Sequence, residues 1–316
     1  MRKPFFPLVC VVCLMVPLLP ADAKTEVAVF IGSPGEEAFN SRFFDWAKRL
    51  EQALVQGSGL EAAAIHRYPS QPTDPPLTRE EVEKALQHLG GRLVPEDQLV
   101  VILIGHGSES GSPRFILEGP DLDAMSLATW LDGVPSTSQL VVHTASGSGA
   151  FVGPLGAAGR VVCASTEPGA GKNAPEFMEY LVAALEQGRG DADRNGRLSW
   201  GEWLNVAASD TAAWYEGEGY IQSEHAILDD TGDGQGVRLP VAQVETGQDG
   251  FQASQQYLAG LPIRDPIRQA RYESALEAVA ALRAEKETME PAAYWEALER
   301  LLLDVALNYP EGEANP

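Results

Sequence analysis

One histidine lies between two glycines at the end of a hydrophobic run, in the segment QLVVILIGHG at residues 98–107. The run is apolar without alternation, which is typical of a strand covered on both faces in a parallel sheet. Glycines permit a sharp turn and a close approach by another group. His106 is therefore expected at the carboxyl edge of the sheet, where open α/β sheets bind ligands, as a candidate general base.

A second hydrophobic segment, 139–144 (QLVVHT), ends in the turn 145–149 (ASGSG). Because sequential strands are neighbours by default, Ser146 is expected to face His106 as a candidate nucleophile beside a candidate base. The backbone amides of Gly107 and of residues 146–147 would form an oxyanion pocket. A serine needs a histidine that is itself oriented, usually by a carboxylate; no acidic residue of either turn is clearly placed for this, although Glu109 is near in sequence.

A third segment, 191–202 (DADRNGRLSWGE), follows the spacing of an EF-hand calcium loop, with a glycine at the sharp turn. Hard oxygen ligands would come from both side chains and one backbone carbonyl. The alternative is an acidic turn that caps the following helix. We expect one structural Ca²⁺ ion, because the chain has a single such loop and no paired sensor. The expected ligands are Asp191, Asp193, Asn195, the carbonyl of Arg197, Ser199 and Glu202.

A second acidic turn, 229–234 (DDTGDG), lacks a closing glutamate at EF-hand distance. It is either a plain turn or a means of bringing carboxylates and His225 near the cleft or the first metal loop.

The elements that must position these groups alternate between strand and helix. This alternation predicts an α/β fold with a mostly parallel sheet between two layers of helices. After about residue 262 the pattern changes to two helices rich in Ala, Leu, Glu and Arg, each opened by a proline. We expect strands at 26–32, 61–68, 98–104, 139–144 and 160–165, a short extended segment at 114–120, helices at 38–55, 126–131 and 174–186 and after Thr78, and a C-terminal helical hairpin at 266–286 and 291–308.

Five stretches together resemble the caspase–hemoglobinase fold (clan CD), and within it the legumain-like peptidases and their bacterial secreted relatives. They are VVILIGHGS, LEGPDLDAMSLATWLD, LVVHTASGSGAF, GRVVCAST and EHAILDDTGDG, spread over about residues 26–236. The resemblance implies a three-layer αβα caspase-like sheet and descent from cysteine-type endopeptidases. It places His106 at the catalytic histidine and Ser146 at the nucleophilic cysteine, with Ser148 and Gly149 matching the Ser-Gly that follows that cysteine.

The replacement of cysteine by Ser146 bears directly on activity. A thiolate forms near neutral pH and is strongly nucleophilic, whereas a hydroxyl needs a well-placed base. Cys163 cannot substitute, because it lies within an apolar strand. The resemblance thus predicts a peptidase homologue that is catalytically inactive and binds a peptide or protein partner. The alternatives are a hydrolase that uses Ser146 and His106, and a structural module whose C-terminal helices carry the interaction.

The N-terminal segment indicates where the protein is located, and the net charge limits the partners that it can bind. Residues 1–23 combine a basic start, an apolar run and an A-x-A site, which predicts a secretory signal peptide and a periplasmic or extracellular protein. The organisation expected is a domain at 24–262 followed by the hairpin at 263–316. A net charge of −22 argues against nucleic acid and anionic lipid as partners. No later stretch is apolar enough to insert into a membrane after signal cleavage.

Overall fold

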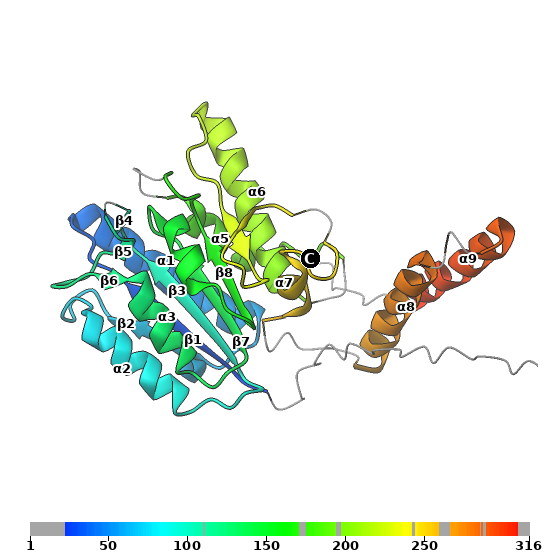
Figure 1. Cartoon of the computed structure of the whole chain (residues 1–316), viewed down its shortest axis with the longest axis horizontal. Coiled ribbons are helices and arrows are strands. Elements are labelled where there is room, and N and C mark those ends of the chain that lie inside the picture. Colours follow the sequence, from blue (N-terminus) through cyan, green and yellow to red (C-terminus); the bar gives the residue numbers. More distant parts are fainter. Residues whose placement is uncertain are drawn as a thin grey trace, which may run out of the picture.

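The computed structural model describes residues 23–109, 111–170, 175–193, 197–241, 244–258, 266–284, 286 and 289–308 (Figure 1). The predicted signal peptide falls outside these residues except for Ala23. Within the described part of the chain, no helix has the length and apolar character needed to cross a membrane.

A seven-stranded sheet forms the centre of the molecule, in the order β10-β9-β8-β7-β3-β1-β2. Its first five strands in chain order pair in parallel, and the last two pair antiparallel at one edge. The two central strands, β3 and β7, are buried along their whole length, and each contains the hydrophobic run that predicts a covered strand. The strands are β1 (Thr25–Ile31), β2 (Ile65–Tyr68), β3 (Gln98–Ile104), β7 (Ser138–His143), β8 (Arg160–Ala164), β9 (Ile227–Asp229) and β10 (Val237–Arg238).

Helices cover both faces of this sheet (Figure 1). Alternate residues of β1 show the division, since Val27 and Val29 pack into one core and Ala28 and Phe30 into the other. The predicted three-layer α/β architecture is therefore confirmed. The first core contains α1 (Glu37–Gly57), α5 (Phe177–Glu186) and α6 (Trp200–Glu218), and the second contains α2 (Arg79–Gly90), α3 (Ala124–Asp132) and α4 (Val152–Leu155).

Two predicted strands are shorter than expected. Ala62–Ala64 forms a 3-10 turn before β2, because alanine prefers helical backbone and has too little side chain to pack on a sheet. The extended segment at 114–120 contributes only β5 (Arg114–Phe115), which joins β4 (Gly107–Ser108) and β6 (Leu122–Asp123) in a small antiparallel sheet. This small sheet lies directly after β3 in the chain, so it holds the residues that follow His106.

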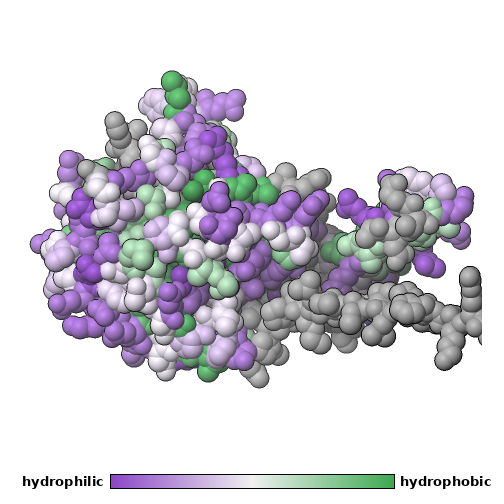
Figure 2. Space-filling view, in the orientation of Figure 1, coloured by the Kyte–Doolittle hydropathy of each residue, from purple (hydrophilic) through white to green (hydrophobic). Residues whose placement is uncertain are grey.

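The C-terminal helices α8 (Pro266–Ala284) and α9 (Pro291–Asn308) pack against each other, close to the predicted ranges. The Tyr272 hydroxyl of α8 donates a hydrogen bond of 2.8 Å to the carbonyl of Asp193 in the acidic loop. The short helix α7 (Phe251–Gln255) precedes the hairpin, and the predicted boundary at 262–263 lies outside the described residues. In the view of Figure 2, hydrophilic residues cover most of the sheet domain's surface.

Candidate functional site at the carboxyl edge of the sheet

The turns that follow β3 and β7 meet at one edge of the sheet. The two strands are parallel neighbours, with Leu103 opposite His143, so His106 and Ser146 lie beyond the same end of the pair. The Ser146 hydroxyl accepts a hydrogen bond from the Gly107 amide at 3.2 Å and donates one to the Gly107 carbonyl at 3.1 Å. The expected meeting of the two turns is therefore present.

The glycines of both turns are required by close backbone approach. A Cβ on Gly107 would lie 2.2 Å from the Ser146 carbonyl oxygen, so no other residue fits without displacing that turn. Gly147 has a φ of +68°, which side chains disfavour. A Cβ on Gly149 would lie 2.4 Å from the backbone of Glu167, in the loop after β8. Three loops are thus fitted together at this edge, those after β3, β7 and β8.

The imidazole of His106 is held by a backbone carbonyl and two aromatic rings. Its Nε2 lies 3.1 Å from the carbonyl oxygen of Pro34, and the rings of Phe39 and Phe43 pack edge-on at centroid distances of 4.6 and 5.2 Å. Because a carbonyl only accepts, Nε2 carries the proton and Nδ1 is the acceptor of the neutral ring. Sequence reasoning missed Pro34; the signal that could have found it is the turn after the first strand, which ends at the same edge.

The turns that carry His106 and Ser146, the predicted catalytic pair, are in contact, but the two side chains are not hydrogen-bonded to each other. In the part of the chain that the structure describes, no hydrogen bond links His106 to Ser146. The hydroxyl proton of Ser146 goes to the Gly107 carbonyl, and the Gly107 amide, the expected oxyanion donor, is bonded to the hydroxyl oxygen. Ser146 is 8% exposed, so the hydroxyl is largely covered by the turn that it ties down.

Three other reactive side chains near this edge are structural. Ser148 is fully buried and within 3.2 Å of the hydroxyls of Ser165 and Thr166. His143 is fully buried between two phenylalanine rings, and burial lowers its pKa to about 3, which keeps it neutral. Burial raises the pKa of the Cys163 thiol, so this residue is a core hydrophobe, as expected from its place in a strand.

Glu109 does not orient the histidine. One of its carboxylate oxygens accepts a hydrogen bond of 2.7 Å from the Gly169 amide, and its Cγ lies 2.9 Å from the position of a Cβ on Gly147. Glu109 therefore links the loop after β3 to the loop after β8. The carboxylate that a serine–histidine pair usually needs is replaced at His106 by the Pro34 carbonyl.

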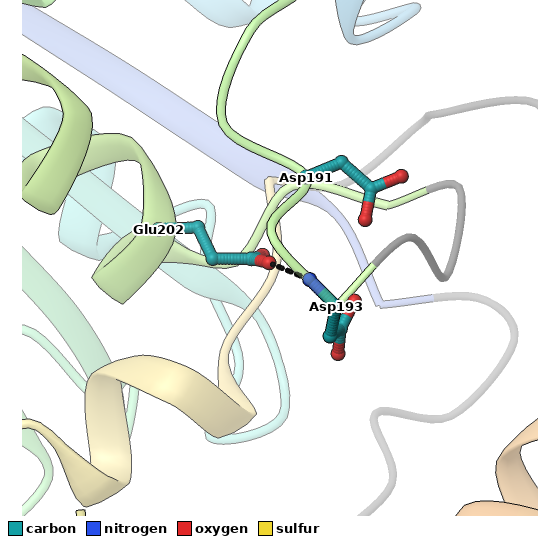
Figure 3. Close-up of side chains that lie close together, drawn as sticks. All are labelled: Asp191, Asp193 and Glu202. Atoms are coloured by element: carbon teal, nitrogen blue, oxygen red, sulfur yellow. Dashed lines mark hydrogen bonds between the residues drawn. The ribbon is translucent and has the colours of Figure 1, made fainter. Parts of the chain in front are cut away.

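The acidic loop joins α5 to α6 and gathers three of its expected ligands. One carboxylate oxygen each from Asp191, Asp193 and Glu202 lies within 4.8 Å of the others. Figure 3 shows Glu202 reaching from the first turn of α6 towards the loop, where it accepts from the Asp193 amide at 3.3 Å. Its other oxygen accepts from the Ser199 amide and hydroxyl at 2.9 and 2.8 Å.

The structure describes two of the three other expected calcium ligands, Arg197 and Ser199. Asn195 lies outside the described residues. The guanidinium of Arg197 stacks over the ring of Tyr257 at 3.7 Å, which leaves only the Arg197 backbone as a source of ligand. Ser199 and Glu202 form a capping box at the start of α6, the alternative role considered for this segment. The oxygens of this loop are suited to a hard cation by type and spacing.

The second acidic turn mainly caps backbone amides. Asp229 accepts from the amides of Gly232 and Gly234, both at 2.8 Å, and Asp230 accepts from those of Gly250 and Ala253 at 3.0 and 2.7 Å. Burial raises the pKa of both carboxyls. Oxygens of Asp229, Asp233 and Asp249 also lie within 4.8 Å of one another, but the hydrogen bonds point to a structural turn.

His225 lies beside the edge that carries the two turns. It directly precedes the segment leading into β9, which pairs with β8 through Ile227 and Ala164. Burial, with a smaller contribution from Arg238, lowers the pKa of His225. Arg238 forms an ion pair of 2.7 Å with Glu167, the residue packed against Gly149. His225 therefore lies near the loop after β8, a position that the sequence alone did not fix.

Comparisons with known proteins gave structural likeness only. No profile of a protein family matches the chain, and neither does any curated protein sequence. The chain is similar to caspase-1 from Spodoptera frugiperda at 14% identity and a TM-score of 0.46, over 66% of this chain and 88% of the caspase. It is similar to drICE at 14% identity and 0.42, over 63% and 87%, and to a Geobacter sulfurreducens protein at 11% and 0.43, over 65% and 92%.

Proposed function

We propose that this protein is a secreted, catalytically inactive member of the caspase-like and legumain-like peptidases that binds an extended peptide or a protein segment at the carboxyl edge of its sheet. The observation that carries the proposal is the closed contact between Ser146 and Gly107. The Ser146 hydroxyl, at the position of the nucleophile, donates its hydrogen bond to the Gly107 carbonyl. Its oxygen accepts a hydrogen bond from the Gly107 amide, the group that would otherwise stabilise an oxyanion. The nucleophile and the oxyanion donor that acyl transfer requires are therefore hydrogen-bonded to each other's residue rather than free to act on a substrate.

The same edge retains what a binding site needs. Three loops meet there, and an imidazole with a fixed tautomer offers an acceptor at Nδ1. Backbone groups in loops beyond a parallel sheet are well placed to bind an extended chain. A hydrolase that uses Ser146 is the second candidate, favoured by that same Nδ1 acceptor.

The acidic loop supports a structural Ca²⁺ ion as a second part of this proposal. Asp191, Asp193 and Glu202 supply clustered carboxylate oxygens, and the Arg197 carbonyl, Asn195 and Ser199 complete the sequence pattern. Affinity in the range of about 10⁻⁴–10⁻³ M, usual for extracellular modules, would suit an exported protein. The ion would fix the connection between α5 and α6 and has no part in the peptide site.

An array of immobilised decapeptides of varied sequence tests the binding role. The full chain, stained on the array, is expected to bind a subset of peptides and to leave all of them uncleaved. A Ser146→Trp variant should lose binding because the indole does not fit beside Gly107 and must displace the two turns, whereas Ser146→Ala should keep it. Peptide cleavage that disappears in Ser146→Ala would establish the hydrolase instead.

A further inference from the structure

A cavity of about 240 Å³ lies beside the proposed peptide site, between the end of β1, the start of α1 and the proline-rich loop after β2. Pro34 lines this cavity, and its carbonyl oxygen is the group that holds His106. The cavity is therefore adjacent to the imidazole, with one residue shared between the two.

The walls of this cavity combine an apolar floor with an acidic rim. Its lining includes the apolar side chains of Ile31, Phe44 and Leu77 and the carboxylates of Glu36, Glu37 and Asp74, without any lysine, arginine or histidine. Ile31, Phe44 and Leu77 are buried, whereas the three acidic residues are exposed.

Among the described residues, no cationic side chain pairs with the rim carboxylates. No ion pair between described residues uses Glu36, Glu37 or Asp74. Asp74 accepts one hydrogen bond of 2.9 Å from the Gln71 amide, within its own loop. Glu37 lies in the first turn of α1, where the helix dipole favours a negative charge. The negative potential of the rim is thus directed at solvent and at whatever enters the cavity.

We infer that this cavity is a subsite for a lysine or arginine side chain of the bound peptide, an inference that rests on the proposed function. Both side chains have an apolar stem and a cationic end, so one such side chain can contact the apolar residues of the lining and pair with its carboxylates. A purely apolar side chain would leave the carboxylates unpaired, and an acidic one would be repelled.

The test uses the same decapeptide array, stained with the full chain and with two triple variants. The first variant removes the rim charges (Glu36→Gln, Glu37→Gln, Asp74→Asn). The second, a matched control, removes three exposed carboxylates that do not line the cavity (Glu216→Gln, Glu218→Gln, Glu245→Gln). Peptides selected by the unmodified chain are then resynthesised with citrulline in place of arginine or norleucine in place of lysine, which keeps the stem and removes the charge.

We expect basic residues to be enriched at one peptide position, and a loss of about tenfold in affinity on replacing that residue by its neutral analogue. In the rim variant this discrimination should fall to about twofold or less, while the control variant keeps it. Binding without basic preference, or a preference that survives in the rim variant, would overturn the subsite and leave the proposed function standing. If no peptide binds, the proposed function fails and the subsite fails with it.

Discussion

At position 146, serine and cysteine differ in more than nucleophilicity. A hydroxyl makes good hydrogen bonds as both donor and acceptor, whereas a thiol is weak in both roles. The two bonds between Ser146 and Gly107 therefore depend on oxygen being present. Under the proposed function, a serine in place of the family's cysteine removes a reactive group and ties the two turns together, as expected for a site that binds without cleaving.

The absence of a side chain at residue 107 is predicted to be essential for this contact. In Gly107→Ala the new Cβ would collide with the Ser146 carbonyl, so the turn must shift, at a cost of about 1–3 kcal/mol as in overpacked cores. Urea denaturation followed by circular dichroism measures the loss. The control is Gly217→Ala, within α6, where no atom lies within 4 Å of the added Cβ. A Gly107→Ala variant as stable as the unmodified protein would contradict the close approach.

A buried carboxyl predicts a pH dependence of stability. Glu224 accepts hydrogen bonds of 2.8 Å from the amides of Glu176 and Phe177, and burial raises its pKa from 4.5 to about 7. The folded protein therefore holds this proton more tightly than the unfolded chain. The stability that the group contributes is fully present below pH 4.5 and is lost as the pH rises to about 7.

The variant Glu224→Gln should remove this dependence, since an amide does not titrate. Relative to the unmodified protein, the variant should gain on the order of 3 kcal/mol between pH 4.5 and 8, at 1.36 kcal/mol for each pKa unit. Denaturation midpoints across this range measure the difference, with Glu216→Gln, on an exposed turn of α6, as the control for loss of one carboxylate. Parallel pH profiles of Glu224→Gln and the unmodified protein would contradict this prediction.

At the scale of elements, the acidic loop and helix α6 share one glutamate. Glu202 closes both the expected calcium site and the capping box of α6. Glutamine can fill the capping role but is a poor bidentate ligand for Ca²⁺. The two roles can therefore be separated by one substitution.

We expect about 10 mM Ca²⁺ to stabilise the unmodified protein by about 1.4–2.7 kcal/mol, the linkage value for a site with an affinity of about 10⁻⁴–10⁻³ M. Thermal denaturation with and without EDTA measures this shift in Tm. Glu202→Gln should abolish the shift, while Glu81→Gln, the same change in the capping box of α2, should keep it. An equal Tm with Ca²⁺ and with EDTA in the unmodified protein would exclude the site.

The positions of helices and strands could be predicted where a local sequence pattern, such as a proline or a hydrophobic run, agreed with how the segment packs in the fold. The hairpin helices begin at prolines, and the buried strands β3 and β7 contain hydrophobic runs, so the positions of these elements follow from the sequence. The strand predicted from residue 61 starts too early, because the three alanines before β2 prefer helical backbone and have too little side chain to pack on a sheet. At the site, glycines on both turns indicated where the loops meet. The partner of His106 could not be found, because Pro34 contributes a carbonyl that any residue possesses.

At the scale of the whole molecule, the net charge is −22, and the cavity beside the proposed binding edge is lined by both apolar and acidic residues. Charge of this sign favours cationic partners through long-range attraction, which weakens as salt is added. Under the proposed function, the basic-peptide subsite, the expected calcium loop and the closed contact between Ser146 and Gly107 belong to one acidic binding module.

The most direct test of the central claim is the intact mass of the full chain after incubation with a fluorophosphonate, a reagent that labels activated serine hydroxyls. We predict an unchanged mass, because the Ser146 proton is held by the Gly107 carbonyl and the amide is already occupied. An adduct that maps to Ser146 and is missing from Ser146→Ala would contradict the account and show a working serine nucleophile.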